Sequence, residues 1–291
     1  MNPEKADFIV GRHQEAEYKL NKRRLNSDNP QGPVAARDQD FVSDLTERGK
    51  KDGRQEAKDF FGEFNFNPET DAFFFVSSDF VRAVETANFY RQEAEERGFE
   101  VILPNNPGDP TVEKVGEGKI KHINNLSLKI DDGLLDQLFN AKTDYLMQAL
   151  DRGVKLPPDL IVRWRKARRL IEGDNKGGWS ENWRRHSEAV KQIMPEIQTA
   201  QEMFETQFKN MIRLMEFGRK KIEAAGCKKR IRVIAFTHEN LFTHWLSEYW
   251  NEPGLNLGEK VLFYHDGENN LRSVVRGKDQ SVEFEEETAR E

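Results

Sequence analysis

The sequence has a single cysteine, Cys227, among its 291 residues. An intramolecular disulfide and a cluster of thiolate metal ligands are therefore excluded. Long apolar runs are also missing, since no stretch approaches the roughly 18 apolar residues that a membrane-spanning helix needs. The first residues carry charges at Glu4, Lys5 and Asp7, where a secretory signal peptide would be apolar. We therefore expect a cytoplasmic protein that does not interact with a membrane.

Positive charge is not in surplus. The chain has 45 Lys and Arg residues against 51 Asp and Glu residues, a net charge of −6, which argues against a nucleic-acid partner. A local basic run at residues 163–169 is interpreted as a solvated helix face with Trp164 packed beneath it. Three of the histidines, His122, His244 and His265, have no second histidine at a metal-ligand spacing. We expect neither a metal nor another cofactor.

Short β-rich runs alternate with helical patterns in much of the chain. Helical spacing covers residues 52–61 and 80–97, and Gly98 suits the end of the second helix. Such alternation is typical of a mostly parallel sheet covered on both faces. The fold class predicted is α/β, a three-layer α/β/α arrangement. The expected strands are residues 7–10, 72–76, 100–103 and 230–236.

Residues 134–225 show helix signals without a convincing strand. We interpret them as a long helical insertion within one domain that spans residues 1–291. An apolar stripe at spacings of three and four predicts one long helix in this insertion. The stripe is interpreted first as packing surface, and alternatively as a cap over the active site or a homodimer interface. Its members are Ile193, Ile197, Ala200, Phe204, Phe208, Met211 and Met215.

The C-terminal part has three more short runs, at residues 261–264, 271–276 and 281–284. Turn-forming pairs separate them, Asp266-Gly267 and Gly277-Lys278. These residues predict an antiparallel edge of the sheet.

Four short segments carry the residues with chemical potential. They are residues 8–15, 45–49, 76–87 and 233–240. Ligands of open α/β sheets bind outside the carboxyl ends of the strands. Arg12 and His13 follow the first expected strand, and His238 follows the strand at residues 230–236. Arg82 follows the second strand, so we expect all four side chains to converge in one crevice.

Two guanidinium groups and two imidazoles form a cationic pocket. A phosphomonoester carries about −1.5 to −2 charges near neutral pH, and arginine binds its oxygens in pairs. A neutral imidazole can attack phosphorus, while a second ring can donate to an oxygen on which charge develops. The four residues therefore predict phosphoryl transfer.

The four segments resemble the histidine phosphatase, or phosphoglycerate mutase-like, superfamily. The Arg-His-Gly motif of that family is matched by residues 12–14, with Gln14 in place of glycine. Its Leu-Thr-x-x-Gly motif corresponds to residues 45–49, and its Ser-Ser-x-x-x-Arg-Ala-x-x-Thr-Ala motif to residues 77–87. The resemblance covers about residues 6–104 and 229–250.

The resemblance implies a role for each matching residue. His13 is expected to accept the phosphoryl group, and Arg12, Arg82 and His238 to bind it. Because glycine allows backbone conformations that other residues restrict, Gln14 leaves two alternatives. Either the loop tolerates the side chain, or Gln14 adds an amide donor to the pocket.

The general acid is the least defined residue. A leaving alkoxide needs a carboxylic acid with a raised pKa, and in relatives this residue often follows the second arginine by a few tens of residues. Glu113 and Glu117 have this spacing, and Glu113 is preferred. Glu239 is the rival, because some branches carry an acid directly after the second histidine.

The function predicted is that of a metal-independent phosphatase with a phosphohistidine intermediate on His13. The substrate would be a phosphorylated small molecule or a phosphoprotein. Two alternatives stay open: a phosphoglycerate-mutase-type phosphotransferase, and a non-catalytic phosphate-binding or scaffold protein of the same fold.

Overall fold

The computed structural model describes residues 6–16, 45–78, 81–105, 115–122, 158–195 and 197–282. Glu113 and the first part of the expected insertion, residues 134–157, lie outside these ranges.

A central eight-stranded sheet organises the described chain, with the strand order β3-β2-β5-β1-β6-β7-β8 and with β4 also pairing to β2. Strands β1 to β5 are mutually parallel. They coincide with the four predicted strands, apart from the two-residue β4, which the sequence pattern missed. Their bounds are β1 (Phe8–Arg12), β2 (Asp71–Ser77), β3 (Glu100–Ile102), β4 (Lys121–His122) and β5 (Arg230–Thr237).

The predicted antiparallel edge is confirmed as β6 (Lys260–His265), β7 (Leu271–Val275) and β8 (Lys278–Ser281). The third strand begins three residues earlier than predicted. Arg276 and Gly277 both have positive φ, 48° and 82°, and form a two-residue turn that pairs Val275 with Lys278. Strand β8 is therefore polar, which a search for apolar runs overlooks.

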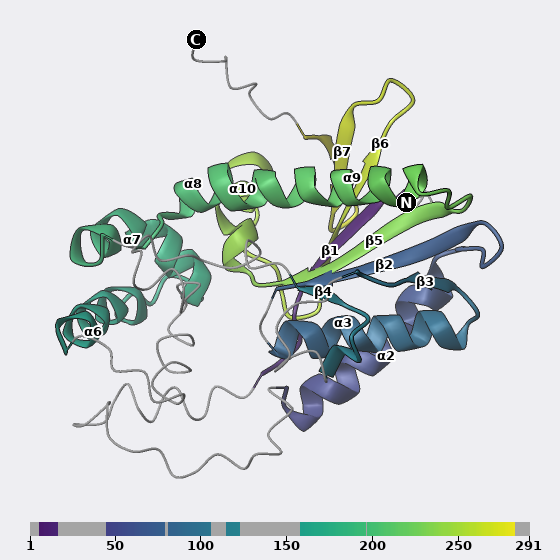
Figure 1. Ribbon diagram of the computed structural model, residues 1–291. Helices are drawn as coiled ribbons and strands as arrows, with labels where there is room; N and C mark the ends of the chain where they lie inside the picture. The colour runs from purple at the N-terminus through teal and green to yellow at the C-terminus, as the bar shows by residue number, and fades with distance from the viewer. Residues whose placement is uncertain are drawn as a thin grey trace.

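Helices α2 (Glu47–Glu63) and α3 (Val81–Glu96) pack on one face of the sheet (Figure 1). The first begins at Thr46, whose side chain accepts from the Gly49 N–H. The second ends before Gly98, where φ is +80°. Alternate strand residues, such as Ile234 and Phe236, join this cluster.

Helices α9 (Lys209–Ala224) and α10 (Asn240–Trp250) cover the opposite face (Figure 1). The intervening strand residues, such as Val233 and Ala235, point to this side. Helices α6 (Pro158–Glu172) and α7 (Trp179–Ile193) contribute to the same cluster. The three-layer α/β/α prediction is confirmed.

The apolar stripe does not lie on a single helix. Helix α7 ends at Ile193, Pro195 follows, and Thr199 with Glu202 forms a capping box that starts a new helix. This helix runs through α8 (Ala200–Met203), a π-helical segment η3 (Phe204–Phe208) and α9. The stripe residues from Ala200 to Met215 are buried in the core, which confirms the interpretation as packing surface.

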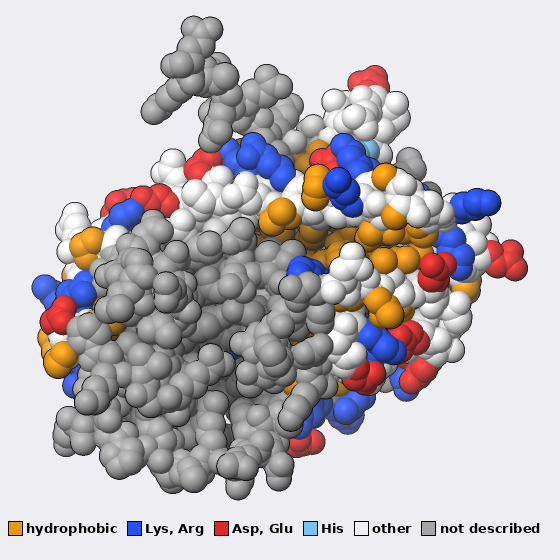
Figure 2. All heavy atoms as spheres, in the orientation of Figure 1, with side chains coloured by type: hydrophobic (Ala, Val, Ile, Leu, Met, Phe, Trp, Pro, Cys, Tyr) orange, Lys and Arg blue, Asp and Glu red, His pale blue; other side chains and the backbone are white. Residues whose placement is uncertain are grey.

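The face that carries α9 is incompletely covered by the described helices. Phe74 on β2 and Ile102 on β3 are only partly buried there. Figure 2 shows hydrophobic side chains in a band below α9. On α6, Trp164 is buried and the partly exposed Arg163 pairs with Asp159 one turn away, as predicted, whereas Arg168 is largely buried and pairs with Glu172.

Candidate active site

Two histidines meet where β1 and β5 end. The strands are parallel neighbours in which Arg12 pairs with Thr237, so His13 and His238 leave the sheet at the same edge. The His13 N–H donates to the Thr237 carbonyl at 2.9 Å. The two rings lie edge to face with centroids 5.0 Å apart, and both are almost fully buried.

Arg82 reaches this pair from the first turn of α3. Its Nε donates to His13 Nε2 at 3.2 Å, and its side chain is buried. His13 Nδ1 lies 2.6 Å from the Gln14 carbonyl oxygen. A guanidinium only donates and a carbonyl only accepts, so Nδ1 carries the proton and Nε2 is the acceptor. His13 is thereby held as a neutral ring whose Nε2 lone pair faces a cation.

The surroundings of His238 add further positive potential. Ser78 Oγ lies 2.9 Å from His238 Nε2, and both residues are buried. His238 lies two residues before the start of α10, and Arg82 is the second residue of α3, so two helix N-termini are near the site. A helix N-terminus carries partial positive charge and favours anions.

Two residues of the second and third segments, Gly49 and Thr86, brace the His13 loop. Thr86 Oγ1 accepts from the Gln14 N–H at 3.1 Å and donates to the Arg82 carbonyl at 2.8 Å. Gly49 leaves room for the loop, because a Cβ there would lie 2.2 Å from the Glu15 carbonyl oxygen. The sequence pattern included both residues without indicating these contacts.

Arg12 lies beside Glu239. Its Nη1 is 2.8 Å from the Glu239 carboxylate and donates to the Leu255 carbonyl at 2.5 Å. A Cβ on Gly254 would lie 2.2 Å from Glu239 Oε1, so the carboxylate is closely packed. The Arg12 guanidinium thus contacts Glu239 and the Leu255 carbonyl, whereas the Arg82 guanidinium contacts the His13 ring.

Of the two acids proposed after Arg82, the described residues include Glu117, which lies away from the site. Glu113 lies outside the described residues. Glu117 is exposed and pairs with Arg91 at 3.0 Å. Arg91 is nine residues further along α3 than Arg82, or about 14 Å at 1.5 Å per residue. Glu117 is therefore a surface partner of Arg91.

The Gln14 side chain occupies a slot that two glycines provide. A Cβ on Gly53 would lie 3.1 Å from Gln14 Cγ, and one on Gly258 would lie 2.4 Å from Gln14 Nε2. Gln14 is buried and is not among the described residues with positive φ. The loop therefore accommodates this side chain between α2 and the segment that precedes β6.

Similar solved structures carry phosphatase names. A mycobacterial glucosyl-3-phosphoglycerate phosphatase is 12% identical, with 93% of this chain and 97% of that chain covered and a TM-score of 0.39. The alpha-ribazole phosphatase from Shigella flexneri is 13% identical, with 95% and 99% covered and a TM-score of 0.40. The Bifidobacterium longum multiple inositol polyphosphate phosphatase, in complex with inositol hexasulfate, is 12% identical, with 95% and 87% covered and a TM-score of 0.45.

No protein-family model matches the chain, and no curated protein matches it in sequence.

Two kinds of feature are absent from the described residues. No group of three or more His, Cys, Asp or Glu side chains within the described ranges has the arrangement of a metal site. None of the helices in those ranges has the length and apolar character needed to cross a bilayer.

The Thr86 hydroxyl should stabilise the His13 loop measurably. Thr86→Val keeps the shape of the side chain but leaves the buried Gln14 N–H without its acceptor, which costs about 1–3 kcal/mol. Urea denaturation measures this loss, and Thr86→Ser should recover most of it. Thr243→Val is the matched control, because Thr243 Oγ1 is equally buried and its described bond is only to the Glu239 carbonyl. Equal losses for both valine variants would show that the Gln14 contact contributes nothing.

Proposed function

We propose that this chain is a phosphatase that hydrolyses a phosphomonoester through a phosphohistidine on His13. The observation that carries the proposal is the contact between Arg82 Nε and His13 Nε2, with His13 Nδ1 bonded to the Gln14 carbonyl. Together the two contacts place a neutral nucleophilic nitrogen next to a fixed cation, at the point where a phosphoryl group would be attacked.

The first step forms a bond between His13 Nε2 and phosphorus and breaks the ester P–O bond. Phosphate oxygens accept from Arg82 in place of Nε2, which frees the nitrogen lone pair for attack. Arg82, His238 and the α3 and α10 N-termini stabilise the charge on the transferring oxygens. In the second step water attacks phosphorus, the P–N bond breaks, and inorganic phosphate leaves with the ring restored.

The departing alkoxide needs a proton. Glu239 accepts from Arg12 in an ion pair, and donation from Glu239 would require a neutral carboxyl that gives up this pair. We therefore assign Glu239 the task of positioning Arg12 at the rim of the site. Glu113 remains the candidate for the acid.

Transfer of a radiolabelled phosphoryl group tests the proposal. The full chain, quenched during turnover of labelled p-nitrophenyl phosphate, should carry the label on the peptide that contains His13. Added glycerol should stay unlabelled while labelled inorganic phosphate accumulates.

Each alternative has its own outcome in that experiment. Label on His13 that passes to glycerol rather than water would identify a phosphotransferase of the mutase type. Binding of phosphate without any label or turnover would identify a non-catalytic phosphate-binding protein. Label on a residue other than His13 would contradict the proposed mechanism.

A further inference from the structure

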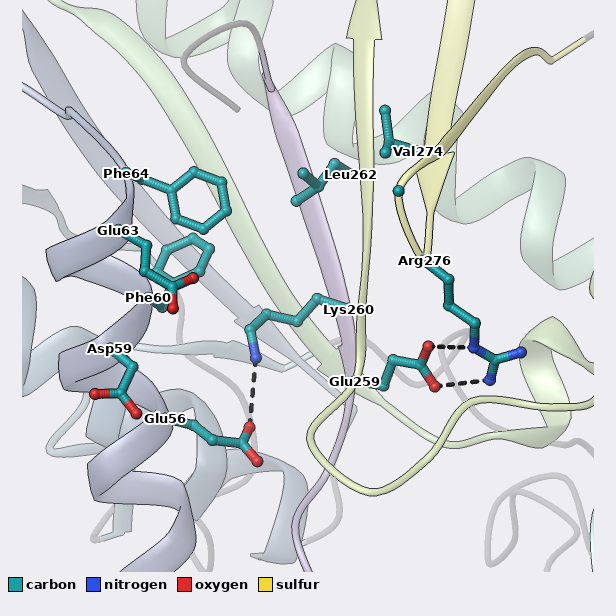
Figure 3. Close-up of a pocket in the computed structure, with 11 residues that line it drawn as sticks. Glu56, Asp59, Phe60, Glu63, Phe64, Glu259, Lys260, Leu262, Val274 and Arg276 are labelled. Carbon is teal, nitrogen blue, oxygen red and sulfur yellow. Dashed lines mark hydrogen bonds and ion pairs between the residues drawn. The ribbon is translucent and has the colours of Figure 1, made fainter. Parts of the chain in front are cut away.

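A pocket lies between α2 and the strands β6 and β7 (Figure 3). Its volume of about 350 Å³ falls within the range of small-molecule sites, about 300–1,000 Å³. None of His13, Arg82 and His238 lines it, so it is distinct from the candidate active site.

The floor of this pocket is apolar and partly aromatic. Phe60 and Phe64 project from α2 with ring centroids 4.4 Å apart. Leu262 and Val274 face them from β6 and β7, where the two residues are register partners. Such a floor suits the apolar body of a ligand.

The two cations of the pocket are already paired. Lys260 Nζ lies 3.4 Å from Glu56, and Arg276 Nε lies 2.7 Å from Glu259, as the dashed lines in Figure 3 show. Lys260 Nζ is also 5.1 Å from the centroid of the Tyr90 ring. Burial lowers the pKa of Lys260, and Glu56 opposes this change. Each of the two cations is paired with a carboxylate, so Lys260 and Arg276 give the pocket no net positive charge.

Two carboxylates remain at the edge of the pocket. Asp59 and Glu63 lie one helical turn apart on α2, and Figure 3 shows Glu63 beside the Phe60 ring and Asp59 one turn below it, near Glu56. Neither forms an ion pair with another described residue; Asp59 accepts from Gln55 at 2.8 Å. Like charges at this spacing destabilise a helix slightly. A positively charged ligand would offset that repulsion.

We propose that this pocket binds an organic ammonium ion with an apolar body. The body would pack on Phe60, Phe64 and Leu262, and the ammonium group would lie between Asp59 and Glu63. Phe64 is only partly buried, so its ring adds a cation–π attraction, whereas Phe60, 3% exposed, forms the base beneath it. An anion of the same shape would meet a lining in which four carboxylates outnumber two cations.

The probe 2-phenylethylammonium tests this proposal when it is titrated into the full chain under amide NMR detection. Saturable shifts are expected for residues 56–64 and 260–262, with weak affinity because the ligand is small. The anion 3-phenylpropionate has the same ring and should produce no saturable shift. The double variant Asp59→Asn/Glu63→Gln should weaken binding of the cation about tenfold.

The matched control is Glu47→Gln/Asp52→Asn. It removes the same charge from the same helix, and neither residue lines the pocket. Affinity in this variant should stay within about twofold of the parent. Equal weakening in both double variants, or equal binding of the anion, would overturn the proposal. Neither outcome depends on phosphatase activity.

Discussion

Replacement of His13 by alanine is expected to lower the kcat for p-nitrophenyl phosphate by about 10⁴-fold or more, the size of effect seen when a covalent nucleophile is lost. The reason is the single protonation form that the site imposes on the ring. Because Gln14 holds the proton on Nδ1 and Arg82 faces Nε2, no second described group offers an equally placed nitrogen. Steady-state hydrolysis of the purified full chain measures the loss.

Two controls make this result interpretable. His265→Ala removes a histidine at the opposite end of the sheet, beyond the start of β1, and should hydrolyse the substrate at the parental rate. A thermal unfolding scan of His13→Ala should show a folded protein. Turnover of a folded His13→Ala variant at the parental rate would remove His13 from the mechanism.

The architecture was largely predictable because its signals are local. The parallel strands are apolar runs with helices between them, so their order along the chain indicated a three-layer fold. The errors in element bounds arise where backbone geometry, rather than an apolar pattern, determines where a strand or helix begins. Strand β8 begins at Lys278 because Arg276 and Gly277 adopt positive φ, and a polar strand leaves no apolar signal. The stripe was divided because Pro195 and the Thr199 cap separate two helices.

The site was predictable to the extent that strand ends define it. His13 and His238 follow paired strands, and a common edge for both was expected from topology. The Arg12–Glu239 pair is not predictable in this way, because a position directly after His238 indicates an acid and gives no sign of a contact with Arg12. The sequence pattern also gave no indication of the glycines that make room for Gln14. Gln14 fits only because Gly53 and Gly258, distant in sequence, lack side chains where it passes.

Replacement of Arg82 by lysine is expected to lower kcat/KM for p-nitrophenyl phosphate by about 10²–10³-fold, as for the loss of one positioned donor to a developing charge. Lysine keeps the positive charge but lacks the planar fork that can bond two phosphate oxygens at once. The shorter reach of its donors also removes the Nε contact to His13. Steady-state kinetics with this substrate measures the effect.

Arg91→Lys provides the comparison, because Arg91 lies on the same helix and is equally buried, but pairs with Glu95 and Glu117 away from the site. The two variants should lose similar stability, since each breaks buried guanidinium contacts, yet only Arg82→Lys should lose turnover. Comparable kinetic losses in both would mean that α3 acts through its packing alone. Retained turnover in Arg82→Lys would mean that charge suffices and that the fork geometry has no part in binding the phosphoryl group.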